Sequence, residues 1–516
     1  MANFLTDDIH QTFFISDDYL TILGDNTYEY CLYKLFSEKI DLSEFEEKIK
    51  NHRTGRKAFP PALLLRVIFY AYYRGITSSR VIEQQCKTDL KFIALAAGRT
   101  PHFTTIADFV SGHCEAIKTL FQKVLMICDE SKLIGREHFA IDGCKIPSDA
   151  SKEWSGTHKE LQHKADKMKA SAHRIIEKHQ SQDSSQSQKN DNQQRELQTI
   201  DTLLNNADKI ETFLENNEKR IGVGLRKKEV KSNVTDNEST KMTGSKGTIQ
   251  GWNCQGAADE KYQVIIGAEA MGVGPDQTAL KPMIEAIREN LSQDVFDSGV
   301  LLTADTGYSS VVNSDYLSSE SINGVVPDTE FRVRNKKISE SEKYKTHKKN
   351  RQKLRKDKGA GLTAIPATEF HVDFENKTCI CPNGKMMMYQ GDHFKGTRGT
   401  TIRFKGRLPD CRACPMQSKC MKNPIKESGR QVSFFADYKN EISNHERMKN
   451  RIDSEQGRKD YSRRMWTIEP VFANITSNKG LRRIHLRGKV KATCQWQMYC
   501  MVHNIEKLWR YGEVAL

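Results

Sequence analysis

Three acidic residues of the sequence stand where a carboxylate could do chemistry. Asp142 interrupts an apolar, strand-like run, Asp305 ends a second such run, and Glu469 opens a segment with helical spacing. A carboxylate inside a hydrophobic strand costs several kcal/mol of desolvation unless it is paired or binds metal. Three hard oxygen ligands from separate elements suit two Mg²⁺ ions about 4 Å apart, the arrangement that serves both the attacking and the leaving oxygen in phosphodiester chemistry. By position alone, ordinary strand-end and helix-cap carboxylates remain the alternative.

The segments around these acids predict an α/β core. Strand-like runs cover 138–146, 249–258, 261–270, 299–304 and 324–326, and helical spacing covers 276–289 and 311–317. Asp305 then lies at the carboxyl end of a strand, where ligands of open α/β sheets usually bind. Glu469 would flank an apolar helical stripe docked on the sheet, with Pro470 tolerated in the first turn of that helix.

The amino-terminal part of the chain is predicted to be helical. From about residue 28 to 134 apolar residues recur three and four apart, with short polar breaks near 75–77 and 98–101. Ser78 or Ser79 is placed to cap one helix and Thr104 or Thr105 another, and short helices joined by tight turns in a basic setting are the outline of a helix-turn-helix. On this interpretation Ser79 and Arg80 contact DNA, and a plain helical scaffold is the alternative.

Length and charge narrow the class of protein. The 516 residues allow about three domains at roughly 150 residues each. The 80 Lys and Arg against 66 Asp and Glu leave a net charge of +14, which favours a polyanionic partner, with nucleic acid the first candidate. No apolar run reaches the ~20 residues of a membrane span. Residues 1–20 carry acids and no Lys or Arg, so we expect a cytoplasmic protein.

Two insertions interrupt the predicted core. Residues 158–220 have helical periodicity in two arms around a polar stretch, which predicts a helical hairpin. The second insertion begins at residue 331, and 331–358 holds thirteen Lys and Arg against three acids, a net charge of +10. This segment is either a solvated run or an arm that follows DNA phosphates, in which case its affinity falls steeply with salt.

Five of the 13 cysteines cluster in the second insertion, and the other eight are scattered as expected for reduced thiols. Cys411-x-x-Cys414, Cys420 and the distant Cys381-Pro-Asn-Gly turn could close a tetrahedral thiolate site for a structural Zn²⁺. Such a site would stabilise an insertion with little apolar core of its own. Free reduced thiols are the equal alternative, and Cys379 would be the spare.

Several motifs, in this order, resemble the DDE transposases of bacterial insertion sequences, specifically the group numbered eleven eighty-two. The motifs run from Pro61-Ala-Leu-Leu-Leu and Ser78-Ser-Arg-Val-Ile-Glu to Ala140-Ile-Asp-Gly-Cys-Lys-Ile, Gly251-Trp-Asn-Cys-Gln, Ala304-Asp-Thr-Gly-Tyr, Tyr461-Ser-Arg-Arg, Ile468-Glu-Pro-Val-Phe, Lys479-Gly-Leu-Arg-Arg and His503-Asn504. Two departures from the Tyr-Arg-Glu-Lys spacing of related transposases stand out. Four residues rather than three separate Arg464 from Glu469, and Thr476 stands where a Lys is expected.

The resemblance implies an RNase H-like fold, two Mg²⁺ or Mn²⁺ ions, and cutting and joining of the element's own DNA ends. It implies Asp142, Asp305 and Glu469 as metal ligands and as the catalytic residues. It implies Arg464 and Lys479 as contacts to the transferred end, and the basic tail adds Arg482, Arg483 and Arg487 as DNA contacts. Because two DNA ends must meet, a homodimer or larger synaptic complex is expected.

We therefore expect four regions: a helical DNA-binding domain over 1–134, a first part of an RNase H-like mixed sheet with helices on both faces over 135–330, a basic, Cys-containing insertion over 331–440, and a carboxyl-terminal part of the core over 441–516. The predicted function is transposition, with binding of terminal inverted repeats, 3′-end cleavage and strand transfer to target DNA. A catalytically inactive, transposase-derived DNA-binding protein or repressor is the alternative; the three intact acids argue against it. A metal-dependent nuclease without strand transfer differs from a transposase only through the resemblance.

Overall fold

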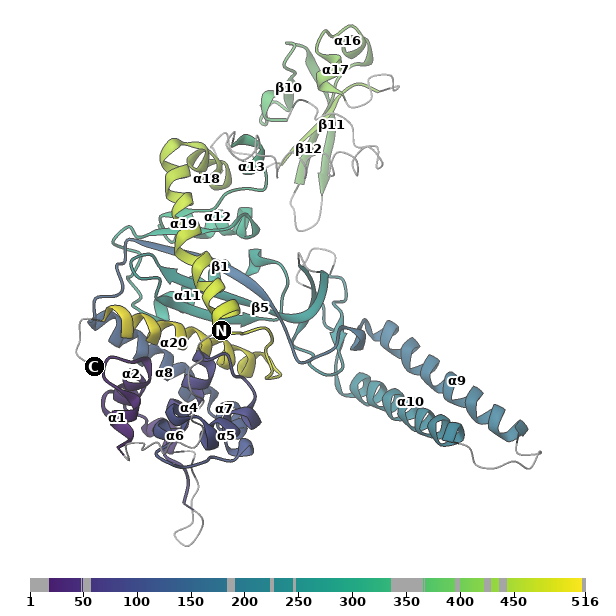
Figure 1. Ribbon diagram of the computed structural model, residues 1–516. Coiled ribbons are helices and arrows are strands. Elements are labelled where there is room, and N and C mark those ends of the chain that lie inside the picture. The colour runs from purple at the N-terminus through teal and green to yellow at the C-terminus, as the bar shows by residue number, and fades with distance from the viewer. Residues whose placement is uncertain are drawn as a thin grey trace, which may run out of the picture. The chain divides into compact units, whose positions relative to one another are not determined.

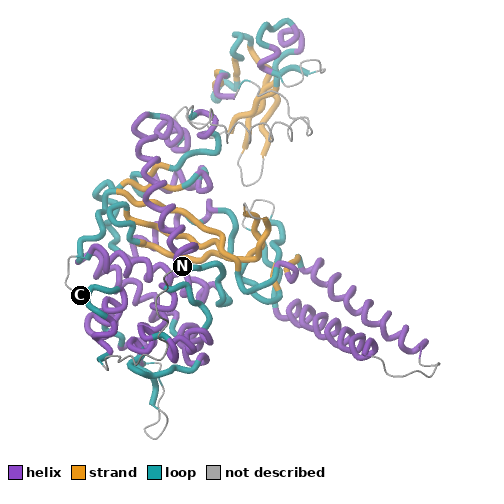
Figure 2. Tube along the Cα trace, viewed as in Figure 1, coloured by secondary structure: helices purple, strands orange, loops and turns teal. Residues whose placement is uncertain are grey.

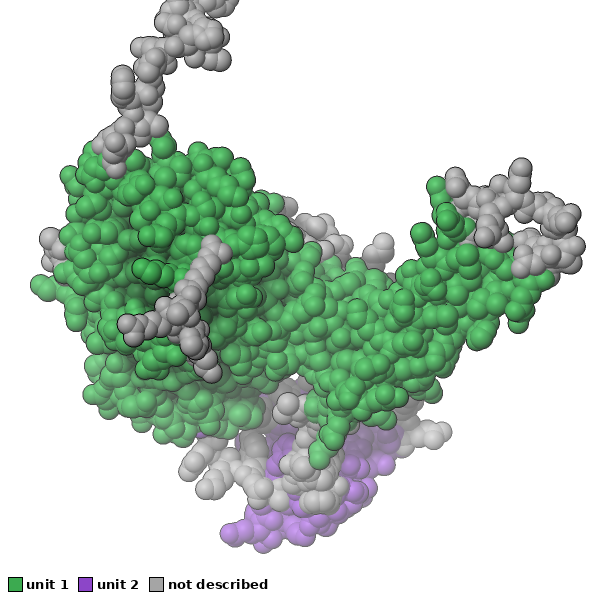
Figure 3. All heavy atoms as spheres, turned by 90° about the horizontal axis from the view of Figure 1, so that it is seen from below, with its two compact units in different colours: residues 1–223, 227–329, 447–516 green, residues 224–226, 330–446 purple. Residues whose placement is uncertain are grey.

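The computed structural model describes residues 18–47, 49, 57–182, 191–222, 227–244, 247–335, 365, 367–394, 400–421, 428–435 and 443–512. The chain forms two compact units, coloured separately in Figure 3. Unit 1 comprises residues 1–223, 227–329 and 447–516, and unit 2 comprises 224–226 and 330–446. In the described part of the chain no helix is both long and apolar enough to cross a membrane.

A mixed sheet forms the centre of unit 1 (Figure 2). It contains β1 (His138–Pro147), β5 (Gly247–Asp259), β6 (Ile265–Met271), β7 (Leu301–Ala304) and β8 (Gly324–Val325), with β4 (Thr240–Gly244) beside the first half of β5. β5 pairs antiparallel with β1 and with β6, whereas β1, β7 and β8 are parallel. The order β6-β5-β1-β7-β8 is consistent with an RNase H-like core, and the predicted α/β class is confirmed.

Helices cover both faces of this sheet, as predicted. On one face, the backbone of Gly267 in β6 lies against Met283 and Ile287 of α11 (Leu280–Asn290). On the other face, Gly256 in β5 lies against Phe472 of α19 (Glu455–Ala473) and Trp496 of α20 (Lys489–Tyr511). α12 (Val311–Ser319) connects β7 to β8, and α18 (Asn444–Asp453) precedes α19. The five strands and two helices predicted for the core all form, with ends shifted by a few residues.

The amino-terminal helices pack on the same core. They are α1 (Tyr19–Leu23), α2 (Tyr28–Lys34), α3 (Ser43–Glu46), α4 (Pro61–Tyr73), α5 (Ser79–Thr88), α6 (Leu90–Leu95), α7 (Phe103–Gly112) and α8 (Cys114–Glu130). Helix α4 is apolar on nearly all sides, which is the pattern of a helix buried in a core. Helix α20 contacts both α8 and β6, and the rings of Tyr72 and Tyr499 stack at 4.6 Å between centroids. One continuous hydrophobic core therefore includes these helices and the sheet.

The expected capping of these helices is correct at one position and wrong at another. Ser78 is the N-cap residue of α5, although its side chain makes no capping hydrogen bond. Helix α7 begins at Phe103, so its N-cap is His102, whose Nδ1 accepts a hydrogen bond from the backbone N–H of Thr104. Thr104 and Thr105 lie inside the first turn. The sequence prediction considered only hydroxyl side chains as caps. It missed His102 because an imidazole nitrogen can accept the same hydrogen bond as a serine oxygen.

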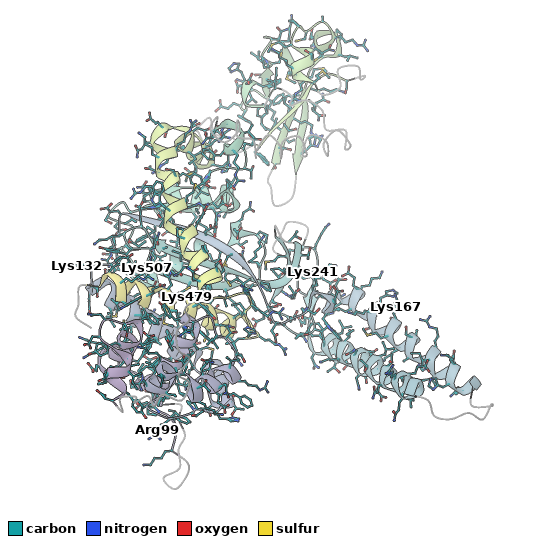
Figure 4. The ribbon with its side chains drawn as sticks, viewed as in Figure 1. Arg99, Lys132, Lys167, Lys241, Lys479 and Lys507 are labelled. Atoms are coloured by element: carbon teal, nitrogen blue, oxygen red, sulfur yellow. The ribbon has the colours of Figure 1, made fainter. Side chains whose placement is uncertain are left out.

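The first insertion is a helical hairpin, as its periodicity predicts. Helices α9 (His158–Gln182) and α10 (Asp191–Asn216) run side by side (Figure 1), and their apolar faces meet in a small cluster that includes Leu161, Ala165, Ala207 and Ile210. The short strands β2 (Ser155–Gly156) and β3 (Ser232–Asn233) pair at its base. Figure 4 labels Lys167 on α9, an exposed residue of the hairpin's basic helix.

Unit 2 is a small, separate α/β module. Its antiparallel sheet has the order β13-β12-β11-β10-β9, formed by β9 (His371–Asp373), β10 (Thr378–Ile380), β11 (Met386–Phe394), β12 (Thr400–Lys405) and β13 (Gln431–Phe435). The short helices α13 (Phe331–Arg334), α16 (Leu408–Arg412) and α17 (Gln417–Cys420) complete it. Residues 336–358, which carry most of the predicted basic arm, lie outside the described residues.

Candidate active site

Strand register brings Asp142 and Asp305 together. β1 and β7 are parallel neighbours, and their last paired residues are Ile141 and Ala304. Asp142 is the next residue within β1 and Asp305 directly follows the end of β7, so the same register sets the two acids side by side where β7 ends. Each carboxylate is held by the backbone that follows it: Asp142 accepts from Gly143 N–H at 2.8 Å, and Asp305 accepts from Thr306 N–H at 2.6 Å.

Helix α19 carries the third acid, Glu469, over the face of the sheet that holds Asp142. Its apolar side chains Ile468 and Val471 are buried, and the missing side chain at Gly256 leaves room for the Phe472 ring, 3.3 Å from where a Cβ would stand. Tyr461 and Arg464 therefore reach Asp305 and Asp142, and Glu469 lies beside Arg464.

The expectation that Glu469 opens a helix is wrong. α19 begins at Glu455, which places Glu469 near its carboxyl end and Pro470 inside the helix. A proline there cannot donate to the carbonyl four residues earlier, which belongs to Trp466. The side-chain amide of Gln263 donates to that Trp466 carbonyl at 2.7 Å, so the freed acceptor is satisfied from outside the helix. The sequence pattern does not predict a proline inside this helix, because the residue that satisfies the Trp466 carbonyl, Gln263, is distant along the chain.

Arg464 lies at the centre of the acidic cluster. Its guanidinium contacts a carboxylate oxygen of Asp142 at 2.7 Å and lies 3.7 Å from a carboxylate oxygen of Glu469. One helical turn earlier, the Tyr461 hydroxyl donates to Asp305 at 3.3 Å. All three predicted acids are therefore linked to one stretch of α19, Asp142 and Glu469 through Arg464 and Asp305 through Tyr461.

The electrostatics of this cluster favour cations. Burial raises the pKa of Asp142, and Asp305 raises it further, while Arg464 and the Gly143 N–H act against the shift. Burial acts to lower the pKa of Arg464, but the negative charge of Asp142 outweighs it and raises that pKa. One guanidinium faces three carboxylates, so negative charge is in excess wherever all three are ionised.

A buried polar network supports the site from the opposite face of the sheet. The carboxylate of Asp276 accepts from the amides of Asn253 at 2.7 Å and Gln255 at 3.1 Å, and the Tyr308 hydroxyl donates to the Gln255 carbonyl oxygen. The Gln255 amide lies where a side chain at position 143 would stand, which explains the glycine after Asp142. Site prediction did not single out these residues, although Asn253, Gln255 and Tyr308 belong to the quoted motifs.

The predicted basic contacts lie in different environments. Arg464 is 7% exposed and Lys479 only 3%. Lys479 pairs with Glu506 at 2.6 Å and lies 4.1 Å above the ring of Tyr73, in the contact between the sheet helices and α4 (Figure 4). Arg483 and Arg487 are more than half exposed and both reach Asp149, at 3.8 and 3.1 Å.

The amino-terminal candidates lie on α5. Ser79 is half-buried and Arg80 is exposed, with its guanidinium 4.6 Å from the centre of the Phe103 ring at the start of α7. Glu83, one turn further along α5, accepts from the Phe103 N–H at 3.0 Å. α5 and the beginning of α7 are thus joined by side-chain contacts, while the outer side of α5 stays accessible.

An open cleft of about 870 Å³ lies along the second half of β1. The carboxyl half of β1 from Gly143 to Pro147 forms one wall, and Thr476, Ser477 and Arg482 form another. Lys145 and Arg482 are the cations that line it. Its nearest lining residue along the chain to a predicted acid is Gly143, which directly follows Asp142.

The acids have the chemistry of a divalent-metal site, but their present arrangement is that of an ion-paired cluster. Carboxylate oxygens, here from the middle of β1, the residue after β7 and helix α19, are the ligands that Mg²⁺ and Mn²⁺ prefer. Within the described ranges, however, no three His, Cys, Asp or Glu side chains are spaced to hold one ion. Arg464 lies between Asp142 and Glu469, so all three acids can share a metal only when this guanidinium moves away from Asp142.

Two protein-family models match the chain. Residues 24–112 match a model described as Transposase domain (DUF772), and residues 380–509 match one described as Transposase DDE domain. The second match includes Arg464, Glu469 and Lys479. No curated protein and no solved structure matches the chain significantly. This pair of domains is typical of insertion-sequence transposases of the eleven-eighty-two type, which confirms the family resemblance drawn from the sequence motifs.

Proposed function

We propose that this protein is the transposase of an insertion sequence, which binds the terminal inverted repeats of its element, cleaves the 3′ ends and joins them to target DNA. The observation that carries the proposal is the convergence of Asp142, Asp305 and Glu469 from two parallel strands and one helix. The transposase-domain matches support the same function independently. Because two DNA ends must be joined in one event, the working form is a homodimer or a larger synaptic assembly.

Asp142, Asp305 and Glu469 are the proposed ligands of two Mg²⁺ or Mn²⁺ ions. When bound, such ions activate the attacking oxygen and stabilise the leaving oxygen of a phosphodiester. The residues of this chain supply the rest: the strand register holds two carboxylates together, Tyr461 orients Asp305, and the network around Gln255 supports the backbone beneath them.

Arg464 has two successive partners in this proposal. In the structure it neutralises Asp142 and approaches Glu469. A guanidinium released from a carboxylate can bind a phosphate with the same forked geometry. Arg464 would therefore exchange Asp142 for a backbone phosphate of the transferred DNA end when the metal ions bind.

The cleft along the second half of β1 is the proposed path of the DNA end. Lys145 and Arg482 line it, and Arg483 and Arg487 follow on the same basic tail. Ser79 and Arg80 on α5 are the proposed contacts to the inverted repeat. Lys479 is buried in an ion pair, so its proposed contribution to DNA contact is to fix the backbone that leads to Arg482.

The experiment is cleavage and joining of DNA carrying the element's flanking ends, with Mg²⁺ or Mn²⁺, by the full-length protein. Glu469→Gln removes one proposed ligand, and Glu455→Gln is the matched control because Glu455 is a strongly exposed acid at the other end of α19. We expect metal-dependent 3′ cutting and joined products from the native protein and from Glu455→Gln, and neither from Glu469→Gln. Tight end binding without cutting by the native protein would favour a DNA-binding remnant, and cutting without joining would favour a nuclease.

A further inference from the structure

Unit 2 has a very small apolar core. Seven buried side chains form it: Phe370, Cys379, Met387, Ile402, Phe404, Val432 and Phe434. A module of this size rarely buries enough apolar surface to offset the entropy of ordering its chain, and small modules of this kind usually need a disulfide or a metal ion. All the cysteines are free thiols in the structure, so no disulfide provides that stabilisation.

Four cysteines from three separate segments line one cavity beside this core. Cys381 follows β10, Cys411 lies in α16, Cys414 lies just after it, and Cys420 ends α17. Cys379 does not line the cavity; it is fully buried in the sheet core, where its sulfur contacts that of Met387 at 3.8 Å. The structure thus separates the one spare thiol from the other four.

The backbone around the cavity is shaped for these thiols. Cys381 begins a tight turn in which Gly384 N–H donates to the Cys381 carbonyl at 2.8 Å, and Gly384 has a φ of +71°. The sulfur of Cys411 lies 2.8 Å from where a Cβ on Gly406 would stand and 3.2 Å from that of Gly429. Any side chain at either glycine would push the Cys411 sulfur, so both glycines keep space for it.

Positive charge exceeds negative charge at the cavity. Lys385, Arg407 and Arg430 line it with the cysteines, against one acid, Asp410. Nearby cations stabilise the thiolate form, which is the form that binds metal.

We propose that Cys381, Cys411, Cys414 and Cys420 bind one structural zinc ion as four thiolates. Four cysteines with one Cys-x-x-Cys pair are a common ligand set of closed, tetrahedral zinc sites. In the described structure no three of these sulfurs are yet at ligand spacing, so binding would draw them inward across the cavity, each thiol releasing its proton to solvent. The metal would join the turn after β10 to α16 and α17. This site is independent of the acidic cluster and of the proposed transposition chemistry.

The test is the metal content of the full-length protein purified from cells grown with zinc. We expect one zinc ion per chain, no iron, and release of the zinc to a colorimetric chelator when the thiols of the native protein are modified with a mercurial. Cys411→Ser and Cys414→Ser should lose the zinc, whereas Cys379→Ala should keep it. Cobalt substituted into the native protein should show thiolate charge-transfer absorption.

Two results would overturn the proposal. One is native protein that carries no zinc, or carries iron instead, after purification without chelators. The other is full zinc retention by a Cys411→Ser/Cys414→Ser double variant. The release experiment uses only native protein, so the proposal stays testable even where a variant fails to fold. None of these readouts depends on transposition activity.

Discussion

The guanidinium of Arg464 on α19 lies 2.7 Å from the carboxylate of Asp142 on β1, two residues 322 positions apart in the chain. This ion pair places a cation where a divalent metal would have to meet the acid. The ion pair offsets part of the negative charge of the three proposed catalytic acids. Binding of a divalent metal ion to Asp142 would displace the guanidinium of Arg464. Arg464 would then be free to bind a DNA phosphate.

Removing the charge of Asp142 should separate chemistry from DNA binding. We expect Asp142→Asn to lower the rate of 3′-end cleavage by at least about 100-fold, since even residues that merely orient metal ligands contribute about 10–100-fold. Affinity for the terminal repeats should stay unchanged, because Asp142 lies outside the proposed DNA contacts. Cleavage assays and gel-shift titrations measure the two effects, with the exposed Asp297→Asn as the control. A parallel loss of cleavage and binding would argue against Asp142 as a ligand.

Removing the cation should make the stability of the protein depend on metal. Arg464→Met leaves Asp142 largely buried without its partner, which should lower the free energy of unfolding by up to about 3 kcal/mol in the absence of divalent ions. Mg²⁺ should then raise the melting temperature of Arg464→Met more than that of the native protein. Arg463→Met is the control, because Arg463 pairs with Glu260 and not with the three acids. Equal Mg²⁺ effects in all three proteins would show that Arg464 does not occupy the metal position.

Lys479 should matter for stability more than for direct DNA contact. Burial lowers the pKa of Lys479, and its ion pair with Glu506 acts against that shift. Lys479→Met would leave Glu506 buried, with Arg510 as its remaining cation, and should cost about 3 kcal/mol. The double variant Lys479→Met/Glu506→Gln should recover much of that loss. Denaturant titration of the native protein, the two single variants and the double variant measures the free energies of unfolding that decide this.

The salt dependence of DNA binding provides the contrasting readout for Lys479. Removing a residue that contacts phosphate reduces the magnitude of the slope of log affinity against log salt by about one. We expect no such reduction for Lys479→Met and a clear one for Arg482→Met. A reduced slope for the folded Lys479 variant would restore it as a DNA contact.

The protein should lose stability on mild acidification through His503. Burial lowers the pKa of His503 to about 4, and Lys507 adds to the shift. In the neutral ring, Nε2–H donates to the Gln263 carbonyl and Nδ1 accepts from the Asn474 amide, both at 2.9 Å, so a second proton would break the Asn474 bond. As pH falls from about 6.5 to 4 the unfolded chain takes up a proton that the folded chain does not, and the stability lost is about 3 kcal/mol for this group.

A pH series of unfolding free energies tests this contribution. His503→Gln should flatten the decline between pH 6.5 and 4, whereas the exposed His163→Gln should leave it unchanged. Some decline should persist in His503→Gln, because burial also lowers the pKa of His138 to about 4. An identical pH profile for the native protein and His503→Gln would contradict the assignment.

Local patterns in the sequence determined most of the elements. The apolar, strand-like runs around Asp142 and before Asp305 form β1 and β7, and the segments of helical period in the insertion form the α9–α10 hairpin. These predictions succeed because side-chain direction repeats with the geometry of a strand or a helix over a few residues. The family resemblance was likewise carried by short ordered motifs, and the domain matches confirm it.

Only the tertiary structure decided what those residues contact. The sequence motifs indicated Arg464 and Lys479 as basic residues near the site. The fold pairs Arg464 with Asp142 and buries Lys479 against Glu506. It also placed Pro470 inside a helix, with Gln263 satisfying the carbonyl that the proline leaves free. These contacts join residues far apart in the chain, and no periodicity records which distant partner satisfies a buried charge or carbonyl.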